Sequence, residues 1–111
     1  MKDTRLAEEV VRLHADFCSA LADARRLLIL YALDEGPKNV SQLTKVLEVS
    51  QPTVSRHLKM LRERGLVIAQ REGNAVIYRL ADHRLIQALD LLRAVMRDQW
   101  VRKAELMDSE S

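Results

Sequence analysis

The hydrophobic pattern of this chain changes from a helical to a strand-like period after Gly65. Before that glycine, apolar residues recur every three or four positions, which is the spacing of a helix face. In residues 75–80 they alternate with a period of two, as in a half-buried strand. The turn Arg-Glu-Gly-Asn at 71–74 separates this run from a strand-like segment at 66–70, and glycine and asparagine tolerate positive φ. We therefore expect one β-hairpin.

Residues that break helices are rare in the rest of the chain. Its 111 residues include three glycines and two prolines, while 48% are hydrophobic and 31% are charged. This composition predicts a mainly α-helical globular protein. From the spacing of apolar residues we expect helices over 4–21, 23–34, 41–47, 51–64 and 82–106, with residues 108–111 frayed. No window approaches 18 consecutive apolar residues, so we expect no membrane partner.

The interior is expected to form around the segment 23–34, because this segment is apolar nearly all round. Its apolar residues are Leu27, Leu28, Leu30, Tyr31 and Leu33. The next two helices should each turn one face inward, formed by Val40, Leu43, Val46 and Leu47 in the first and by Val54, Leu58 and Leu61 in the second. Asp3 or Thr4, and later Ser50, are plausible N-caps, with Pro52 in the first turn after Ser50.

A short helix, a three-residue turn at 48–50, a longer helix and a hairpin together form the layout of a winged helix-turn-helix. We expect the helix-turn-helix over 40–64 and the wing over 66–80, within a single domain over 1–111. Residues 51–79 contain six basic and two acidic side chains, although the formal net charge of the whole chain is only +2. This local excess of positive charge points to double-stranded DNA as the partner.

The predicted DNA contacts come from the free side of helix 51–64 and from the tip of the wing. Short hydrogen-bonding groups stand first on that helix and cations follow, an order that suits base edges and then phosphates. An arginine on a thin glycine-containing turn can reach a minor groove or adjacent phosphates. The residues are Gln51, Thr53, Ser55, Arg56, His57, Lys59 and Arg62 on the helix, and Arg71 and Asn74 on the wing. For His57, which directly precedes Leu58, packing is an alternative to DNA contact.

The segment 43–80, LTKVLEVSQPTVSRHLKMLRERGLVIAQREGNAVIYRL, resembles the DNA-binding core of the ArsR family of bacterial and archaeal repressors. Three elements carry the resemblance: S-Q-P-T-V-S-R-H-L, L-x-x-x-G-L-V and R-x-G-x-x-x-x-Y-x-L. The resemblance implies a homodimeric repressor that binds an imperfect inverted repeat and releases it when a metal ion or another inducer binds.

Two metal sites of that family lack their ligands in this chain. The resemblance places a C-x-C pair at Asn39 and Ser41, and neither residue is a thiolate. It places a zinc set on the last helix at Asp82, Arg84, Val95 and Asp98, where two imidazoles are missing. We therefore predict no metal and no cofactor, and a small-molecule inducer of unknown identity, if the chain has one.

Cys18 and His14 leave one sensing alternative open. They stand one helical turn apart and could ligate one ion or support a thiol response. In the other interpretation, Cys18 is a small buried hydrophobe and His14 a polar flank of the apolar stripe. As the single cysteine, Cys18 cannot form a disulfide within the chain, and a reduced, cytoplasmic protein is expected.

The terminal helices 4–21 and 82–106 are predicted to form the homodimer interface. Both have wide apolar faces, and a helix of about 25 residues, near 37 Å long, is too long for one small chain to cover. The predicted interface residues are Leu6, Val10, Leu13, Phe17, Leu85, Leu89, Leu92 and Met96. An alternative is a winged helix used for protein–protein contact. We predict no enzyme, because no catalytic set or phosphate-binding glycine loop is apparent.

Overall fold

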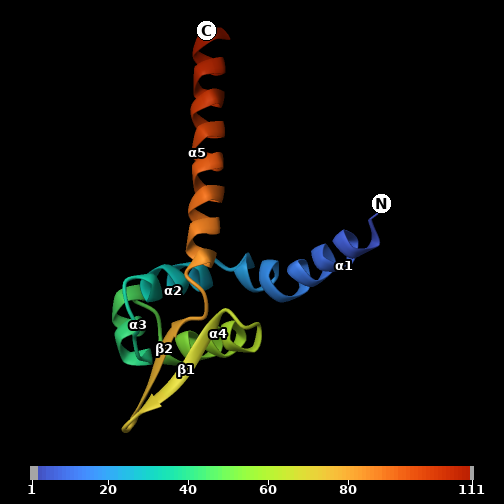
Figure 1. Cartoon of the computed structure of the whole chain (residues 1–111). Helices are drawn as coiled ribbons and strands as arrows, with labels where there is room; N and C mark the ends of the chain where they lie inside the picture. Colours follow the sequence, from blue (N-terminus) through green and yellow to red (C-terminus); the bar gives the residue numbers. More distant parts are fainter. Residues whose placement is uncertain (1–2, 111) are drawn as a thin grey trace.

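The computed structural model describes the backbone of residues 3–110. The chain forms five α-helices and one two-stranded antiparallel sheet, and the elements follow the predicted order (Figure 1). They are α1 (Thr4–Leu13), a π-helical turn η1 (His14–Cys18), a 3₁₀ turn η2 (Ala20–Ala22), α2 (Ala24–Asp34), α3 (Val40–Leu47), α4 (Gln51–Glu63), β1 (Val67–Glu72), β2 (Ala75–Leu80) and α5 (Arg84–Glu110).

Two predicted helix boundaries need correction. The segment 4–21 is not one regular α-helix, because its hydrogen bonding widens to a π-turn at 14–18 and tightens to a 3₁₀ turn at 20–22. The C-terminal residues 108–110, expected to fray, continue α5; residue 111 lies outside the described residues. We refer to residues 14–22, which join α1 to α2, as the N-terminal junction.

Side-chain caps fix the starts of the helices, as expected from the sequence. Asp3 accepts a hydrogen bond from the Leu6 amide at 3.2 Å and begins α1. Asn39 and Gln42 form a reciprocal capping box on α3, with both bonds at 2.8 Å. Ser50 caps α4 ahead of Pro52.

The core gathers around α2, and its largest fully buried side chains come from α2, α3 and α4. The largest are Ile29, Leu30, Leu33, Leu43, Val54, Leu58 and Leu61. The predictions for Leu28 and Val46 are wrong, because these side chains are 53% and 55% exposed. Leu28 and Val46 each lie on the side of their helix that faces away from the buried residues. Both are therefore apolar side chains that face solvent.

The hairpin pairs Val67 with Leu80 at its base and Glu72 with Ala75 at its tip. β1 therefore extends two residues further than predicted, and the connection is the two-residue turn Gly73-Asn74, where Gly73 has a φ of +62°. A backbone bridge that the sequence pattern did not reveal ties β2 to the core. The Lys38 and Tyr78 amides donate to each other's carbonyls at 3.0 and 2.8 Å.

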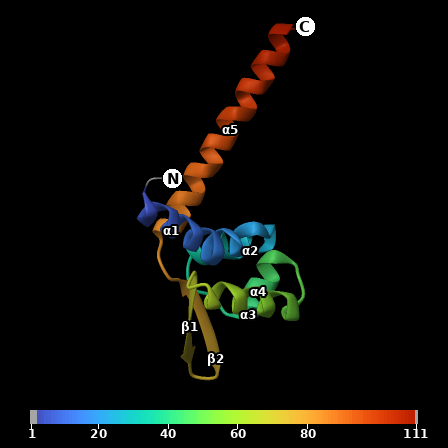
Figure 2. The same cartoon turned by 90° about the vertical axis from the view of Figure 1, so that its right-hand side faces the viewer.

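The chain is elongated, with α5 and α1 projecting from the core in different directions (Figures 1 and 2). Its radius of gyration is 17.6 Å and its extents are 60 × 42 × 21 Å, whereas a compact chain of this length would have a radius of gyration of about 13 Å. None of the helices over residues 3–110 is long and apolar enough to cross a membrane.

Candidate nucleic-acid interface

The turn between α3 and α4 sets the angle at which α4 leaves the core. Glu48 ends α3 in the left-handed conformation, with a φ of 56°, and Ser50 then starts α4. The apolar face of α4 is fully buried at Val54, Leu58 and Leu61, as predicted. The helix is therefore held on one side and presents its other side to solvent.

The solvent side of α4 carries the predicted sequence of hydrogen-bonding groups and cations. Gln51, Ser55, Arg56, Lys59 and Arg62 are all exposed. None of the three cations among them forms an ion pair with any residue in the described range 3–110. Their charges are therefore free to meet an anionic partner.

Thr53 lies at the first turn of this face and is partly engaged in the helix cap. Its hydroxyl oxygen is 2.7 Å from the Ser50 hydroxyl, and its amide donates to Ser50 Oγ at 3.4 Å. The side chain is half-buried. Any base contact from Thr53 therefore competes with this cap.

The prediction that His57 contacts DNA is wrong. Its side chain is only 4% exposed and points to the interior, where Nδ1 lies 3.3 Å from a guanidinium nitrogen of Arg26. His57 directly precedes Leu58 on the buried side of α4, where Val54, Leu58 and Leu61 are fully buried, and it therefore has the alternative role of packing.

The wing projects at the end of the molecule opposite the C-terminus of α5, and α4 lies at that same end (Figures 1 and 2). Arg71 and Asn74 are exposed near the tip. Arg79 forms an ion pair with Glu72 of the facing strand at 3.8 Å, and Arg64 forms one with Asp16 at 3.7 Å. Of the cations between 51 and 79, these two are therefore engaged within the chain.

The metal positions implied by the family resemblance have other roles in this structure. Asn39 caps α3. Asp82 binds the Arg84 guanidinium at 2.7 Å and the Arg84 amide at 2.9 Å, and these bonds lower the pKa of the Asp82 carboxyl to about 2. Within the described part of the chain, no three His, Cys, Asp or Glu side chains are grouped closely enough to hold a metal ion.

Cys18 and His14 stand at the two ends of the π-turn. Both side chains are exposed, so the interpretation of Cys18 as a buried hydrophobe is wrong. Cys18 lines a groove between the N-terminal junction and α5, beside Leu21, Leu89 and Leu92. The alternative of metal sensing at this pair is not favoured, since a third ligand is lacking among the described residues.

The predicted interface residues divide into two sets. Six of them are exposed, between 38% and 65%: Leu6, Val10, Leu13, Phe17, Leu92 and Met96. Leu89 is only 8% exposed and Leu85 is half-buried, so both already pack against the chain's own core. The groove beside Cys18 is lined by Leu13 of α1, by Phe17 of the N-terminal junction and by residues of α5.

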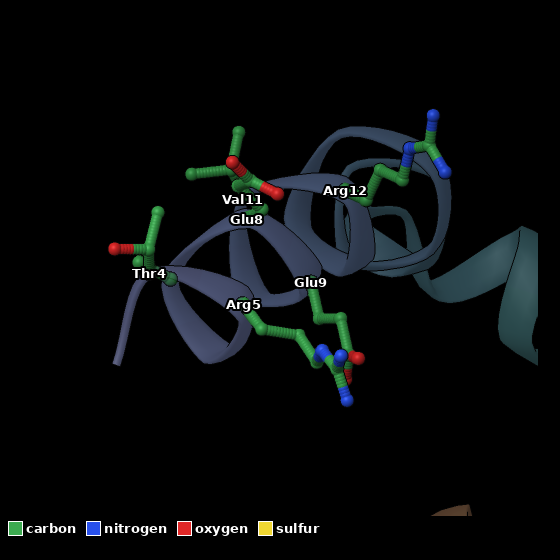
Figure 3. Close-up of a pocket in the computed structure, with 7 residues that line it drawn as sticks. Thr4, Arg5, Glu8, Glu9, Val11 and Arg12 are labelled. Carbon is green, nitrogen blue, oxygen red and sulfur yellow. The ribbon is translucent and has the colours of Figure 1, made fainter.

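Within the described residues, no other element lines the hollow along α1 that includes Arg5, Glu8 and Val11. Figure 3 shows this helix with Arg5 and Glu9 on one side and Glu8 and Val11 on the other. The hollow drawn there is lined only by residues 4–12 of α1 itself. Val11 is 69% exposed.

Comparisons with known proteins agree with this geometry. The family model described as "Bacterial regulatory protein, arsR family" matches residues 23–69, from the start of α2 into β1. The transcriptional repressor SmtB of Mycobacterium tuberculosis is 42% identical over 77 residues, which are 69% of this chain and 57% of SmtB. The chain thus spans a little over half the length of that relative.

Solved structures match over more of the chain. The crystal structure of Rv0081 of Mycobacterium tuberculosis has a TM-score of 0.77 and 30% identity, covering 86% of this chain and 96% of that one. A fragment of the Mycobacterium bovis protein Mb0332, described as a homodimeric winged helix-turn-helix DNA-binding domain, has a TM-score of 0.76 and 30% identity, covering 89% and 91%. The chain has the winged helix-turn-helix fold and belongs to the ArsR family of bacterial transcriptional regulators.

Proposed function

We propose that the chain is a homodimeric repressor that inserts α4 into the major groove of an inverted-repeat operator. The observation that carries this function is the free cationic face of α4, where Arg56, Lys59 and Arg62 are exposed and unpaired within residues 3–110. A helix held by one apolar side can enter a major groove with the other. A surface for protein contact would be expected to carry more apolar side chains at this place.

The roles of individual residues follow from their places on the two elements. Gln51 and Ser55 lie near the N-terminal end of α4 and suit base edges, whereas Lys59 and Arg62 further along suit phosphates. Arg56 lies between these groups and is long enough for either partner. Arg71 and Asn74 on the wing would meet the neighbouring minor groove or its phosphates.

The surface of the single chain supports a dimer. It exposes 8313 Å², whereas a compact monomer of 12.7 kDa would expose about 6,200 Å². The excess comes from α1 and α5, whose apolar faces include Leu92 and Trp100 at 65% and 59% exposure. Isologous packing of these helices would bury them and set the two α4 helices about 34–36 Å apart, one turn of DNA.

The remaining roles belong to the same proposal. The single domain would use 40–64 and 66–80 to bind DNA and its terminal helices to dimerise, with a regulatory rather than a catalytic role in the cytoplasm. The Mycobacterium bovis fragment, described as homodimeric and DNA-binding, supports this arrangement.

Gel retardation with the promoter DNA of the protein's own gene tests this function. The dissociation constant is measured at several salt concentrations, with a duplex of unrelated sequence as the control. We expect tight binding to the promoter that weakens steeply with salt, because lysines and arginines displace counterions from phosphates. Equal binding to both duplexes would refute recognition of an operator. Binding that is independent of salt would refute phosphate contact and favour a protein-contact module.

A further inference from the structure

The side chain of Arg26 connects two parts of the molecule with different expected roles. Arg26 lies on α2, and its Nε donates to the carbonyl of Ala20 in the N-terminal junction. One terminal nitrogen lies 3.5 Å from the Ser19 carbonyl, and the other lies 3.3 Å from Nδ1 of His57 on α4. One guanidinium therefore joins the N-terminal junction to α4.

His57 is almost completely enclosed at this contact. Its side chain is 4% exposed, and its Nε2 is buried without a hydrogen-bond partner among the described residues. Arginine can only donate, so Nδ1 of His57 must accept and the ring proton must sit on Nε2. The Arg26 contact thus requires a neutral imidazole.

Burial disfavours a second proton on His57 and is the largest effect on its pKa. The nearby charges oppose one another: Asp23 at the start of α2 raises the pKa, whereas Arg26 and Arg25 on α2 and Arg56 on α4 lower it. The combined result is a pKa of His57 below its usual 6.5. A protonated ring would lose its acceptor atom and place a cation 3.3 Å from the guanidinium.

We propose that Arg26 and His57 are a positioning pair, which fixes α4 against the N-terminal junction only while His57 is neutral and so makes operator binding sensitive to acid. The proposal rests on the proposed function for its DNA readout. Neither residue touches DNA; the pair acts by holding the angle of α4. A second contact, the exposed Arg64–Asp16 pair at 3.7 Å, joins the same two elements but does not depend on a histidine.

The first test measures operator affinity as a function of pH, for the wild-type chain and for His57→Asn, and compares the two profiles. The asparagine amide oxygen can occupy the place of Nδ1 and accept from Arg26, but it does not titrate. We expect wild-type affinity to fall as the pH drops below about 6.5 and the His57→Asn profile to stay flatter over the same range. Circular dichroism and sedimentation at each pH verify that both proteins remain folded dimers.

Two further variants separate positioning from simple stability. Arg26→Met removes the donor and His57→Phe removes the acceptor, and we expect each to lower operator affinity about tenfold while leaving helix content unchanged. Affinity for unrelated duplex should change little, because the cations of α4 remain. Wild-type operator affinity in Arg26→Met, together with identical pH profiles for wild type and His57→Asn, would overturn the proposal.

Hydrogen exchange of the free protein gives a readout that needs no DNA. We expect the amides of α4 to lose protection on acidification in the wild type and to keep it in His57→Asn. Equal loss in both proteins would overturn the positioning role. If the wild type failed to bind its promoter but showed the expected exchange pattern, the proposed function would fail while the positioning pair stood.

Discussion

The hydroxyl of Tyr31 donates a 2.7 Å hydrogen bond to the carboxylate of Asp90, across 59 residues of sequence. The bond joins α2, at the centre of the core, to α5, which extends from it. Arg93 reinforces the contact, since it lies 3.2 Å from the same carboxylate and 5.2 Å from the centre of the Tyr31 ring. This cluster fixes the base of the long C-terminal helix on the DNA-binding core.

Tyr31→Phe should therefore lower the free energy of unfolding by about 1 kcal/mol, because it removes one hydrogen bond and keeps the ring. Urea denaturation at neutral pH measures the change. Tyr78→Phe is the matched control, since the Tyr78 hydroxyl makes no hydrogen bond within the described residues. Burial and the bond to Asp90 raise the pKa of Tyr31, so this stabilisation should be complete below pH 10 and disappear as the pH rises through the raised pKa. An equal effect of both substitutions would contradict this role.

Truncation of α4 cations should weaken operator binding. If the side chain reads a base, Arg56→Ala or Lys59→Ala should cost about 1–3 kcal/mol of binding free energy. If it contacts phosphate, the substitution should reduce by about one the magnitude of the salt slope, which is the slope of the logarithm of the binding constant against the logarithm of salt concentration. Gel retardation over a salt series separates these outcomes. Lys103→Ala, an exposed cation of α5, is the control for net charge. Unchanged operator affinity in both α4 variants would exclude this helix as the recognition element.

The wing should contribute through charge and not through fold. Arg71 is exposed and unpaired within the described residues, so Arg71→Ala should weaken operator and unrelated DNA alike and lower the salt slope by about one. The free energy of unfolding, measured by thermal denaturation, should stay within about 0.5 kcal/mol of the wild-type value. A loss confined to the operator would instead indicate that Arg71 reads sequence in the groove.

Much of the fold could be predicted because local signals and burial agree. The cap at Ser50, the apolar spacing from Val54 to Leu61 and the alternation of residues 75–80 all specify the elements that the structure contains. Each signal depends on neighbours within a few positions. Such patterns can be recognised without knowledge of the tertiary packing.

The parts that could not be predicted depend on contacts between distant residues. The inward rotation of His57 follows from the packing of α4 against α2, and the Lys38–Tyr78 bridge joins segments 40 residues apart. Glu48 adopts a left-handed conformation that glycine or asparagine more often takes. A glutamate at this position therefore does not indicate a left-handed residue. One signal for His57 was available, since it directly precedes Leu58 on the apolar side of the helix.

The start of α5 should show a specific dependence on acid. Arg84 donates to Asp82 from its guanidinium and its amide and lowers the Asp82 pKa from 3.8 to about 2. Because the folded pKa is the lower one, the stabilisation is present above pH 3.8 and is lost as the pH falls towards 2. Asp82→Asn should therefore be less stable than wild type at neutral pH, with the difference vanishing near pH 2.

Carboxyl NMR titration should find the Asp82 midpoint near 2, and acid unfolding of both proteins measures the stability difference. Asp98→Asn is the control, as it removes an exposed carboxylate from α5 that lies away from the Arg84 contact. A difference between wild type and Asp82→Asn that stays constant down to pH 2 would show that the Arg84 contact does not form in solution.

Leu92 and Leu89 lie one turn apart on α5 but should respond differently to the same substitution. Leu92 is 65% exposed, so Leu92→Asp should leave the fold intact and yield monomers by sedimentation equilibrium, with loss of operator binding. Leu89 is 8% exposed within its own chain, so Leu89→Asp buries a charge in the core and should unfold the protein as well. Gln87→Asp, on the opposite side of α5, should remain a folded dimer. A dimeric Leu92→Asp would move the subunit interface away from this face of α5.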